Sequence, residues 1–180
     1  MIIALNGRAG SGKSTAAQYL VEQHGFTLVK FAGPLKAMMK ALGLGQREIE
    51  GDLKEKPHPL LGGRTPRYAM QTLGTEWGRN IIHSDLWVMA AMERVLDVLD
   101  LGGKAVIDDC RFPNEAKAVI ESGGSIIRLT REGAGITGGH SSEDQELPWN
   151  WEILNNGSIK GLHNAVEAVL WHIKEKGKCA

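Results

Sequence analysis

Apolar residues along the chain form two alternating patterns, short continuous runs and longer runs at helical spacing. A short run bounded by turn residues is typical of a strand that is buried on both faces. Such runs occupy residues 1–5, 27–31, 104–108, 125–129 and 151–154. Helices are expected between them, at about residues 13–24, 33–42, 68–82, 85–99 and 113–122, and from residue 158 onward. Strands that alternate with helices predict an α/β fold with a parallel sheet covered on both faces.

Two segments show neither pattern. Residues 46–63 are polar and charged and contain Pro57, Pro59 and a pair of glycines, so we expect an exposed insertion with at most one short helix. Residues 130–148 are polar and rich in glycine, which favours a mobile flap over a packed element. Ser158 follows a predicted turn and is expected to cap the last helix.

A phosphate-binding loop is predicted where the first strand ends. Residues 7–14 fit the pattern G-x-x-x-x-G-K-[ST], directly after a predicted strand and before a predicted helix. Glycines let backbone N–H groups converge on phosphate oxygens, and the start of the helix adds a positive dipole end. Lys13 is expected to span the β- and γ-phosphates of ATP, and Ser14 to offer its hydroxyl to Mg²⁺. The predicted nucleotide-binding residues are Arg8, Ala9, Gly10, Ser11, Gly12, Lys13, Ser14 and Thr15.

Two neighbouring carboxylates, Asp108 and Asp109, stand at the carboxyl end of a predicted strand, where open α/β sheets bind their ligands. This is the usual place of a second acidic motif in phosphate-binding enzymes. One carboxylate is expected to complete the magnesium shell, and the other to face the acceptor or accept its proton. We assign the metal to Asp108 and the acceptor to Asp109, a division that the sequence itself leaves open.

Phosphoryl transfer requires cations around the transferred group. Arg111 follows the acidic strand and Arg131 follows the next strand, so both are predicted at the edge of the sheet where phosphates would lie. For Arg64 and Arg79 a solvated surface position is an equally good interpretation. The full set of candidate arginines is Arg64, Arg67, Arg79, Arg111, Arg128 and Arg131.

The aromatic and histidine side chains give weaker signals. Trp87 is weighed as a base-stacking residue against a core position, and Trp77 is assigned to the core or an interface. None of the six histidines shows metal-ligand spacing, and His140 is interpreted as a solvated residue of the flap.

Composition narrows the class of protein. The chain has 180 residues, 42% of them hydrophobic, which suits one compact domain. Lys plus Arg and Asp plus Glu each number 21, so no net field favours nucleic acid or an anionic membrane as a partner. Cys110 and Cys179 are too few for a disulfide scaffold, and Cys110 is expected to be buried. With neither a signal peptide nor an apolar stretch of roughly 18 residues, a cytoplasmic protein is expected.

Together these residues resemble the deoxynucleoside monophosphate kinases of tailed bacteriophages, a branch of the nucleoside monophosphate kinase superfamily. The resemblance is carried by the phosphate loop and by the stretches FAGPLK (31–36), RYAMQTLGTE (67–76) with Trp87, DCRFPNE (109–115) and NNGS (155–158). HSSE (140–143) is a weaker match.

The resemblance implies a P-loop kinase with a five-stranded parallel core, an acceptor-binding insertion after the second strand and a lid between the fourth and fifth. We place the core at 1–45 and 102–180, the insertion at about 46–101 and the lid at about 131–148. The implied reaction is ATP-dependent phosphorylation of deoxynucleoside monophosphates, with Arg131 as the lid arginine. By position, the acceptor site would be lined by Lys36, Arg67, Gly74, Thr75, Trp87, Asp109, Arg111 and Glu115.

Other functions on the same loop stay open at this point. Another small-molecule kinase, similar to dephospho-coenzyme A kinase or phosphomevalonate kinase, is the nearest alternative. A nucleotide-operated switch or a nucleic-acid motor is more distant, because a motor needs a basic surface and further motifs that this sequence lacks. The expected partners are small-molecule nucleotides, without nucleic acid or membrane, and the sequence leaves open whether the protein forms a homodimer.

Overall fold

The structure is a computed structural model that describes residues 1–135 and 147–176. His140, the HSSE stretch, most of the expected lid and Cys179 lie outside the described residues. The chain divides into two compact units, one formed by Met1–Val29 with Arg94–Ala180 and the other by Lys30–Glu93. None of the described helices is both long enough and apolar enough to cross a bilayer.

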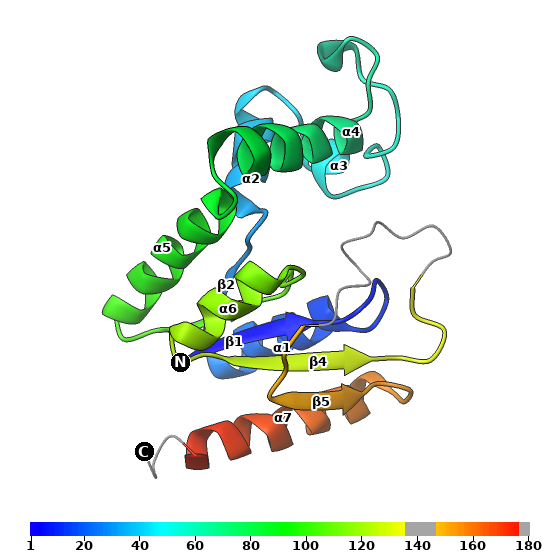
Figure 1. Cartoon of the computed structure of the whole chain (residues 1–180). Coiled ribbons are helices and arrows are strands. Elements are labelled where there is room, and N and C mark those ends of the chain that lie inside the picture. The colour runs from blue at the N-terminus through cyan, green and yellow to red at the C-terminus, as the bar shows by residue number, and fades with distance from the viewer. Residues whose placement is uncertain (136–146, 177–180) are drawn as a thin grey trace. The chain divides into compact units, whose positions relative to one another are not determined.

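The first unit is built on a five-stranded sheet in which all paired strands are parallel (Figure 1). Its strand order is β2-β3-β1-β4-β5. The strands are β1 (Ile2–Asn6), β2 (Phe26–Val29), β3 (Lys104–Ile107), β4 (Ser125–Thr130) and β5 (Trp151–Leu154). The predicted α/β fold with a parallel sheet is therefore confirmed, and each strand lies within three residues of its expected bounds.

Helices cover both faces of this sheet. On one face, α1 (Lys13–His24) and α7 (Ile159–Lys176) pack on Ile3, Leu5 and Ile127 in a single apolar cluster. On the other face, α6 (Pro113–Glu121) packs on β1 and β4 (Figure 1). The Ser158 hydroxyl accepts a hydrogen bond from the Gly161 N–H at 3.1 Å, so the expected cap of the last helix is present.

The second unit has its own small core. It contains α2 (Gly33–Ala41), α3 (Gln46–Ile49), a 3₁₀ turn η1 (Pro59–Leu61), α4 (Pro66–Gln71), η2 (Thr72–Ile82) and the first half of α5 (Leu86–Asp100). Helix α4 continues directly into η2, which is a π-helix and so has wider turns than an α-helix. The buried residues of this core are Leu35, Met39, Leu44, Ile49, Met70 and Trp87.

Three expectations for this part of the chain need correction. The first unit leaves off at Val29 and resumes at Arg94, where we expected 45 and 102. Helix α2 belongs to the second unit because its Leu35 and Met39 pack with Met70 and Trp87. Residues 46–63 are not wholly exposed, since Ile49 is fully buried, and they contain a 3₁₀ turn besides one short α-helix. The helix expected at 68–82 begins at Pro66 and widens at Thr72.

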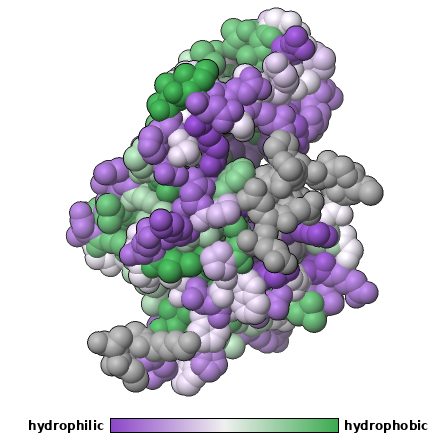
Figure 2. Space-filling model, viewed as in Figure 1, coloured by the Kyte–Doolittle hydropathy of each residue, from purple (hydrophilic) through white to green (hydrophobic). Residues whose placement is uncertain are grey.

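Hydrophilic residues predominate on the face of the molecule drawn in Figure 2, where hydrophobic residues form separate groups among them.

Candidate active site

The loop between β1 and α1 is packed against the ends of two other strands. Gly7 and Gly12 have φ values of 145° and 103°, which side chains rarely adopt. A Cβ on Gly7 would collide with the carbonyl oxygen of Leu129, at the end of β4. A Cβ on Gly12 would collide with the side-chain amide of Asn155, directly after β5. The glycines of the motif therefore let the loop pack closely on β4 and on Asn155, besides leaving backbone N–H groups unobstructed by side chains.

Asn155 and Asn156 link this loop to the segment that follows β4. Asn155 is 7% exposed. Its side-chain Nδ2 donates to the Ser11 carbonyl at 2.9 Å, and its backbone N–H donates to the Thr130 carbonyl at 2.7 Å. Asn156 accepts from the backbone N–H of Glu132 at 2.8 Å. The two asparagines therefore hold both neighbours of Arg131 in register with the phosphate loop.

The segment after β4 also returns to the loop itself. Arg131 lies in a turn closed by a hydrogen bond from the Ala134 N–H to its carbonyl, at 3.1 Å. The Gly135 N–H then donates to the Ala9 carbonyl at 3.1 Å. The start of the expected lid is thus anchored on the nucleotide-binding loop.

Lys13 opens α1, and its ammonium is held by the loop. Its Nζ donates to the carbonyls of Gly7 at 2.5 Å and Arg8 at 2.8 Å. These are neutral acceptors, and charged phosphate oxygens form stronger hydrogen bonds with an ammonium group. A bound triphosphate would therefore offer Lys13 stronger acceptors than these two carbonyls, at the place where the motif predicts them. Ser14, the next residue, is exposed.

The acidic pair follows β3, which neighbours β1 in the sheet. Asp108 is buried, and Asp109 is half-buried. The Asn6 side chain at the end of β1 donates to the Cys110 carbonyl at 3.0 Å, which ties the acidic segment to the start of the phosphate loop. Lys13, Asp108, Asp109, Arg111 and Arg131 all follow carboxyl ends of parallel strands, so they gather at one edge of the sheet.

Cys110 is buried, as expected. Burial, followed by the negative charges of Glu115 and Asp109, raises the pKa of its thiol far above the usual range. The thiol therefore stays protonated, and Cys110 acts as a small apolar residue.

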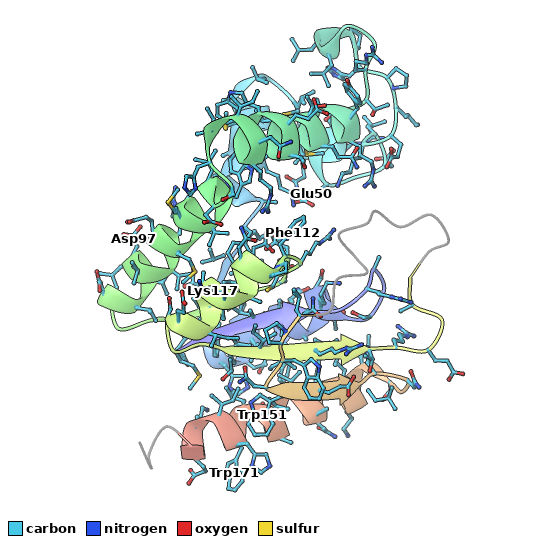
Figure 3. The ribbon with its side chains drawn as sticks, viewed as in Figure 1. Glu50, Asp97, Phe112, Lys117, Trp151 and Trp171 are labelled. Carbon is cyan, nitrogen blue, oxygen red and sulfur yellow. The ribbon has the colours of Figure 1, made fainter. Side chains whose placement is uncertain are left out.

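Glu115 has a different local role from the one the resemblance implies. It is 2% exposed, and its Oε2 accepts hydrogen bonds from the backbone N–H groups of Arg111 at 2.7 Å and Phe112 at 3.0 Å. Phe112, labelled in Figure 3, stands immediately before α6. Glu115 thus caps the helix and fixes the loop that carries Arg111. Direct contact between Glu115 and the acceptor stays a prediction.

The other candidate arginines divide by location. Arg111 and Arg131 are exposed at the sheet edge. Arg128 lies within β4 and pairs with Glu152 of β5, at 3.7 Å between Nε and Oε1. In the second unit, the Arg64 guanidinium lies over the ring of Tyr68, 5.1 Å from its centroid. Arg79 is part of η2.

Five predicted acceptor-binding residues belong to the second unit, namely Lys36, Arg67, Gly74, Thr75 and Trp87. The Lys36 ammonium pairs with Glu50, with 2.7 Å between Nζ and Oε1, and Arg67 pairs with Glu55 through its Nε. Gly74 and Thr75 lie on η2.

Trp87 is a core residue in this structure. It is 5% exposed, and its indole N–H donates to the Gly74 carbonyl at 2.8 Å. A Cβ on Gly78 would collide with the same ring. Trp87 therefore fixes the backbone of η2, and its ring is covered by its own unit, contrary to the base-stacking interpretation. Trp77, assigned to the core or an interface, is 37% exposed.

Known proteins with similar sequences identify the family. Residues 65–166 match the family model described as deoxynucleotide monophosphate kinase. Over an alignment of 186 residues the chain is 36% identical to a protein of Acanthamoeba polyphaga mimivirus that is assigned as a deoxynucleotide monophosphate kinase, covering 92% of this chain and 94% of that protein. The chain belongs to the deoxynucleotide monophosphate kinase family.

Further relatives agree with this family. The chain is 36% identical to the deoxynucleoside-5′-monophosphate kinase of Escherichia phage T5 over 58 residues, which are 32% of this chain and 22% of the phage protein. Two solved structures share the fold. A Chloroflexus aurantiacus protein assigned as a kinase has a TM-score of 0.55 at 12% identity, with 97% of this chain and 96% of that chain covered. Shikimate kinase of Aquifex aeolicus has a TM-score of 0.54 at 11% identity, with 98% of both chains covered.

The family confirms the resemblance drawn from the sequence. Membership of a kinase family implies phosphoryl transfer from a nucleoside triphosphate to a small nucleotide, and it sets aside the switch and motor interpretations. The contacts of Asn155 and Asn156 are the main feature that sequence reasoning missed, although NNGS (155–158) is among the stretches that carry the resemblance. A further local signal is a polar pair directly after an apolar strand, at the sheet edge where ligands bind.

Proposed function

We propose that this chain transfers the γ-phosphoryl group of ATP to the 5′-phosphate of deoxynucleoside monophosphates, yielding the diphosphates and ADP. The observation that carries this proposal is a complete phosphate-binding loop, packed at the sheet edge beside Asp108, Asp109 and Arg131, in a chain of the deoxynucleotide monophosphate kinase family. An oxygen of the acceptor's phosphate bonds to the γ-phosphorus. The bond to the β–γ bridging oxygen breaks, and that oxygen leaves with its electron pair on ADP.

The chain's own contribution to this step is binding, orientation and charge. Backbone N–H groups of residues 8–15 hold the donor's phosphates, and Lys13 leaves the Gly7 and Arg8 carbonyls to contact them. Arg111 and Arg131 neutralise charge that develops on the transferred group. The acceptor's phosphate is already largely ionised at neutral pH, so Asp109 faces the acceptor without having to remove a proton from it.

A magnesium ion fits the oxygen donors at this edge. Ser14 supplies a hydroxyl and Asp108 a buried carboxylate directly after β3. Among the described residues no group of three or more His, Cys, Asp or Glu side chains could hold a metal. One hydroxyl and one carboxylate suit Mg²⁺, which keeps several waters and takes few protein ligands beside the substrate's phosphates. When bound, Mg²⁺ neutralises negative charge on the β- and γ-phosphates.

Two substitutions test the division between the carboxylates. Asp108→Asn is expected to raise the Mg²⁺ concentration needed for half-maximal activity, because it removes a charged ligand. Asp109→Asn is expected to lower activity at every Mg²⁺ concentration without shifting the midpoint. Superimposable magnesium titrations for the two variants would contradict this division.

The function itself is tested by a coupled assay of ADP formation across all four deoxynucleoside and all four ribonucleoside monophosphates. Dephospho-coenzyme A and phosphomevalonate serve as acceptors of other P-loop kinases, and Lys13→Ala controls for contaminating kinases. We expect turnover with one or more deoxynucleoside monophosphates and none with dephospho-coenzyme A or phosphomevalonate. Turnover confined to a non-nucleotide acceptor would overturn the proposal.

A further inference from the structure

One short stretch of the second unit supplies a carboxylate to both cations of that unit that we expect to bind the acceptor. Glu50 directly follows α3, and its Oε1 lies 2.7 Å from the Nζ of Lys36 on α2. Glu55 pairs with Arg67, whose own backbone N–H bonds to the Lys54 carbonyl in the same stretch. Lys36 and Arg67 are 31 positions apart in sequence, yet both meet residues 50–55. Figure 3 labels Glu50 in this unit.

The pair formed by Glu50 is partly shielded from water. The side chains of Lys36 and Glu50 are 18% and 35% exposed. Burial raises the pKa of Glu50, but the hydrogen bond and charge of Lys36, together with the charges of Lys30 and Lys54, more than offset this and lower it overall. Glu50 is therefore ionised at neutral pH and forms a charged pair with Lys36.

A phosphate dianion is a stronger partner for the Lys36 ammonium than a carboxylate is. It carries nearly twice the charge and three acceptor oxygens. Resting on the proposed function, we propose that Glu50 occupies the place of the acceptor's phosphate on Lys36 in the ligand-free enzyme, with Glu55 doing the same on Arg67. The incoming monophosphate displaces both carboxylates.

Such built-in competition lowers the affinity for every anion that binds Lys36, because each must displace Glu50. Weakly charged anions and single carboxylates, which bind an ammonium group weakly, then stay largely unbound at concentrations where a phosphate monoester still binds. Glu50 is expected to matter more than Glu55, because the Arg67–Glu55 pair is largely exposed and exposed pairs contribute little.

Glu50→Gln tests this inference, because the amide keeps the size of the side chain and can still accept from Lys36 without a charge. We expect deoxynucleoside monophosphates to bind about three- to tenfold more tightly, by calorimetry without ATP, and the acceptor KM to fall in parallel. ATP binding should not change. Inorganic phosphate should also inhibit the variant at lower concentrations.

Matched variants separate displacement from a general loss of charge. Glu55→Gln should tighten acceptor binding about twofold or less. Asp52→Asn is the control, because Asp52 lies in the same stretch but pairs with Arg47, a cation not assigned to the acceptor. It should leave acceptor binding unchanged. Thermal melts of all three variants should show the same cooperative transition as the parent enzyme.

Two outcomes overturn the inference. Weaker acceptor binding by Glu50→Gln would make Glu50 a residue that orients Lys36 for catalysis. Unchanged binding would make the pair an ordinary surface contact. Both outcomes presuppose a parent enzyme that phosphorylates deoxynucleotides, so a failure of the proposed function, seen as no turnover by the parent, stays distinguishable from either.

Discussion

The phosphate loop of the first unit is fixed mainly by its backbone, whereas the cations of the second unit are held by side-chain charges. Gly7 and Gly12 pack so closely on their neighbours that a single methyl group would not fit, and Asn155 bonds to the loop from a buried position. Lys36 and Arg67, by contrast, pair with carboxylates in partly or largely exposed contacts. The contacts proposed for ATP's phosphates are therefore stiff, and those proposed for the acceptor exchange readily.

This difference has a physical reason. Backbone N–H groups cannot turn away, so a loop that must receive three linked phosphates is best fixed before they arrive. Cations that are paired with carboxylates stay neutralised until a ligand with stronger acceptor groups displaces those carboxylates. Substitutions in the two units should accordingly differ in kind as well as in size.

The largest effect is expected from Lys13→Ala, which removes the ammonium that the motif brings to the β- and γ-phosphates. We expect kcat to fall by about a thousandfold or more, because charge stabilisation is the main contribution of the protein to phosphoryl transfer. The ammonium donates to the Gly7 and Arg8 carbonyls of a loop that is itself fixed by backbone packing, so circular dichroism and melting should stay normal. A kcat near that of the parent enzyme would show that the loop assignment is wrong.

Arg131→Ala is expected to lower kcat by up to about a thousandfold while both nucleotides bind almost normally. Arg131→Lys should restore only part of the rate, because an ammonium keeps the charge but lacks the planar fork. Arg128→Ala is the control, since that guanidinium pairs with Glu152 of the neighbouring strand β5. Pre-steady-state transfer and calorimetry measure the two quantities. A loss of ATP affinity equal to the loss of rate would make Arg131 a binding residue instead.

Asn155→Asp should weaken ATP binding by roughly ten- to a hundredfold, because an oxygen would replace the donor that faces the Ser11 carbonyl at 2.9 Å. Asn156→Asp adds the same charge one residue away but keeps an acceptor for the Glu132 N–H. The affinity of this variant for ATP should therefore change much less. Calorimetry with ATP compares the two variants. Equal losses would show that the added charge, and not the lost hydrogen bond, is responsible.

The smallest of these effects is expected from Arg67→Ala, which should raise the KM for the monophosphate about tenfold and leave that for ATP unchanged. A hydrogen bond to a charged group contributes about 1.5–3 kcal/mol, and displacement of Glu55 offsets part of it. Arg47→Ala removes a similarly exposed arginine–carboxylate pair, that with Asp52, and serves as the control. Parallel changes in both KM values would remove Arg67 from the acceptor site.

Local sequence signals predict the sheet and the phosphate loop well. Buried strands produce continuous apolar runs, and a tight turn that must bind phosphate requires glycines at fixed spacing, so both leave a mark within a few residues. Glu115 at the third position of α6, after Pro113 at its start, also fits a capping pattern that could have been recognised.

Contacts between distant residues could not be predicted in this way. Asn155 lies 144 positions from Ser11, and nothing near either residue signals their hydrogen bond. The burial of Trp87 depends on Gly78 and on the wide turns of η2, which helical spacing alone does not reveal. The pairing of Lys36 with Glu50 likewise depends on the path of the chain through α3.

The second unit leaves the sheet after β2, at its edge, and the chain returns at β3, the neighbouring strand. No other strand has to be threaded past this excursion, so its length and residues can diverge in evolution while every strand pairing is retained. Lys13, Asp108 and Arg131 all lie outside it. An ancestral kinase with this architecture could therefore acquire new acceptors by replacing residues 30–93, with the residues proposed to bind the triphosphate inherited intact.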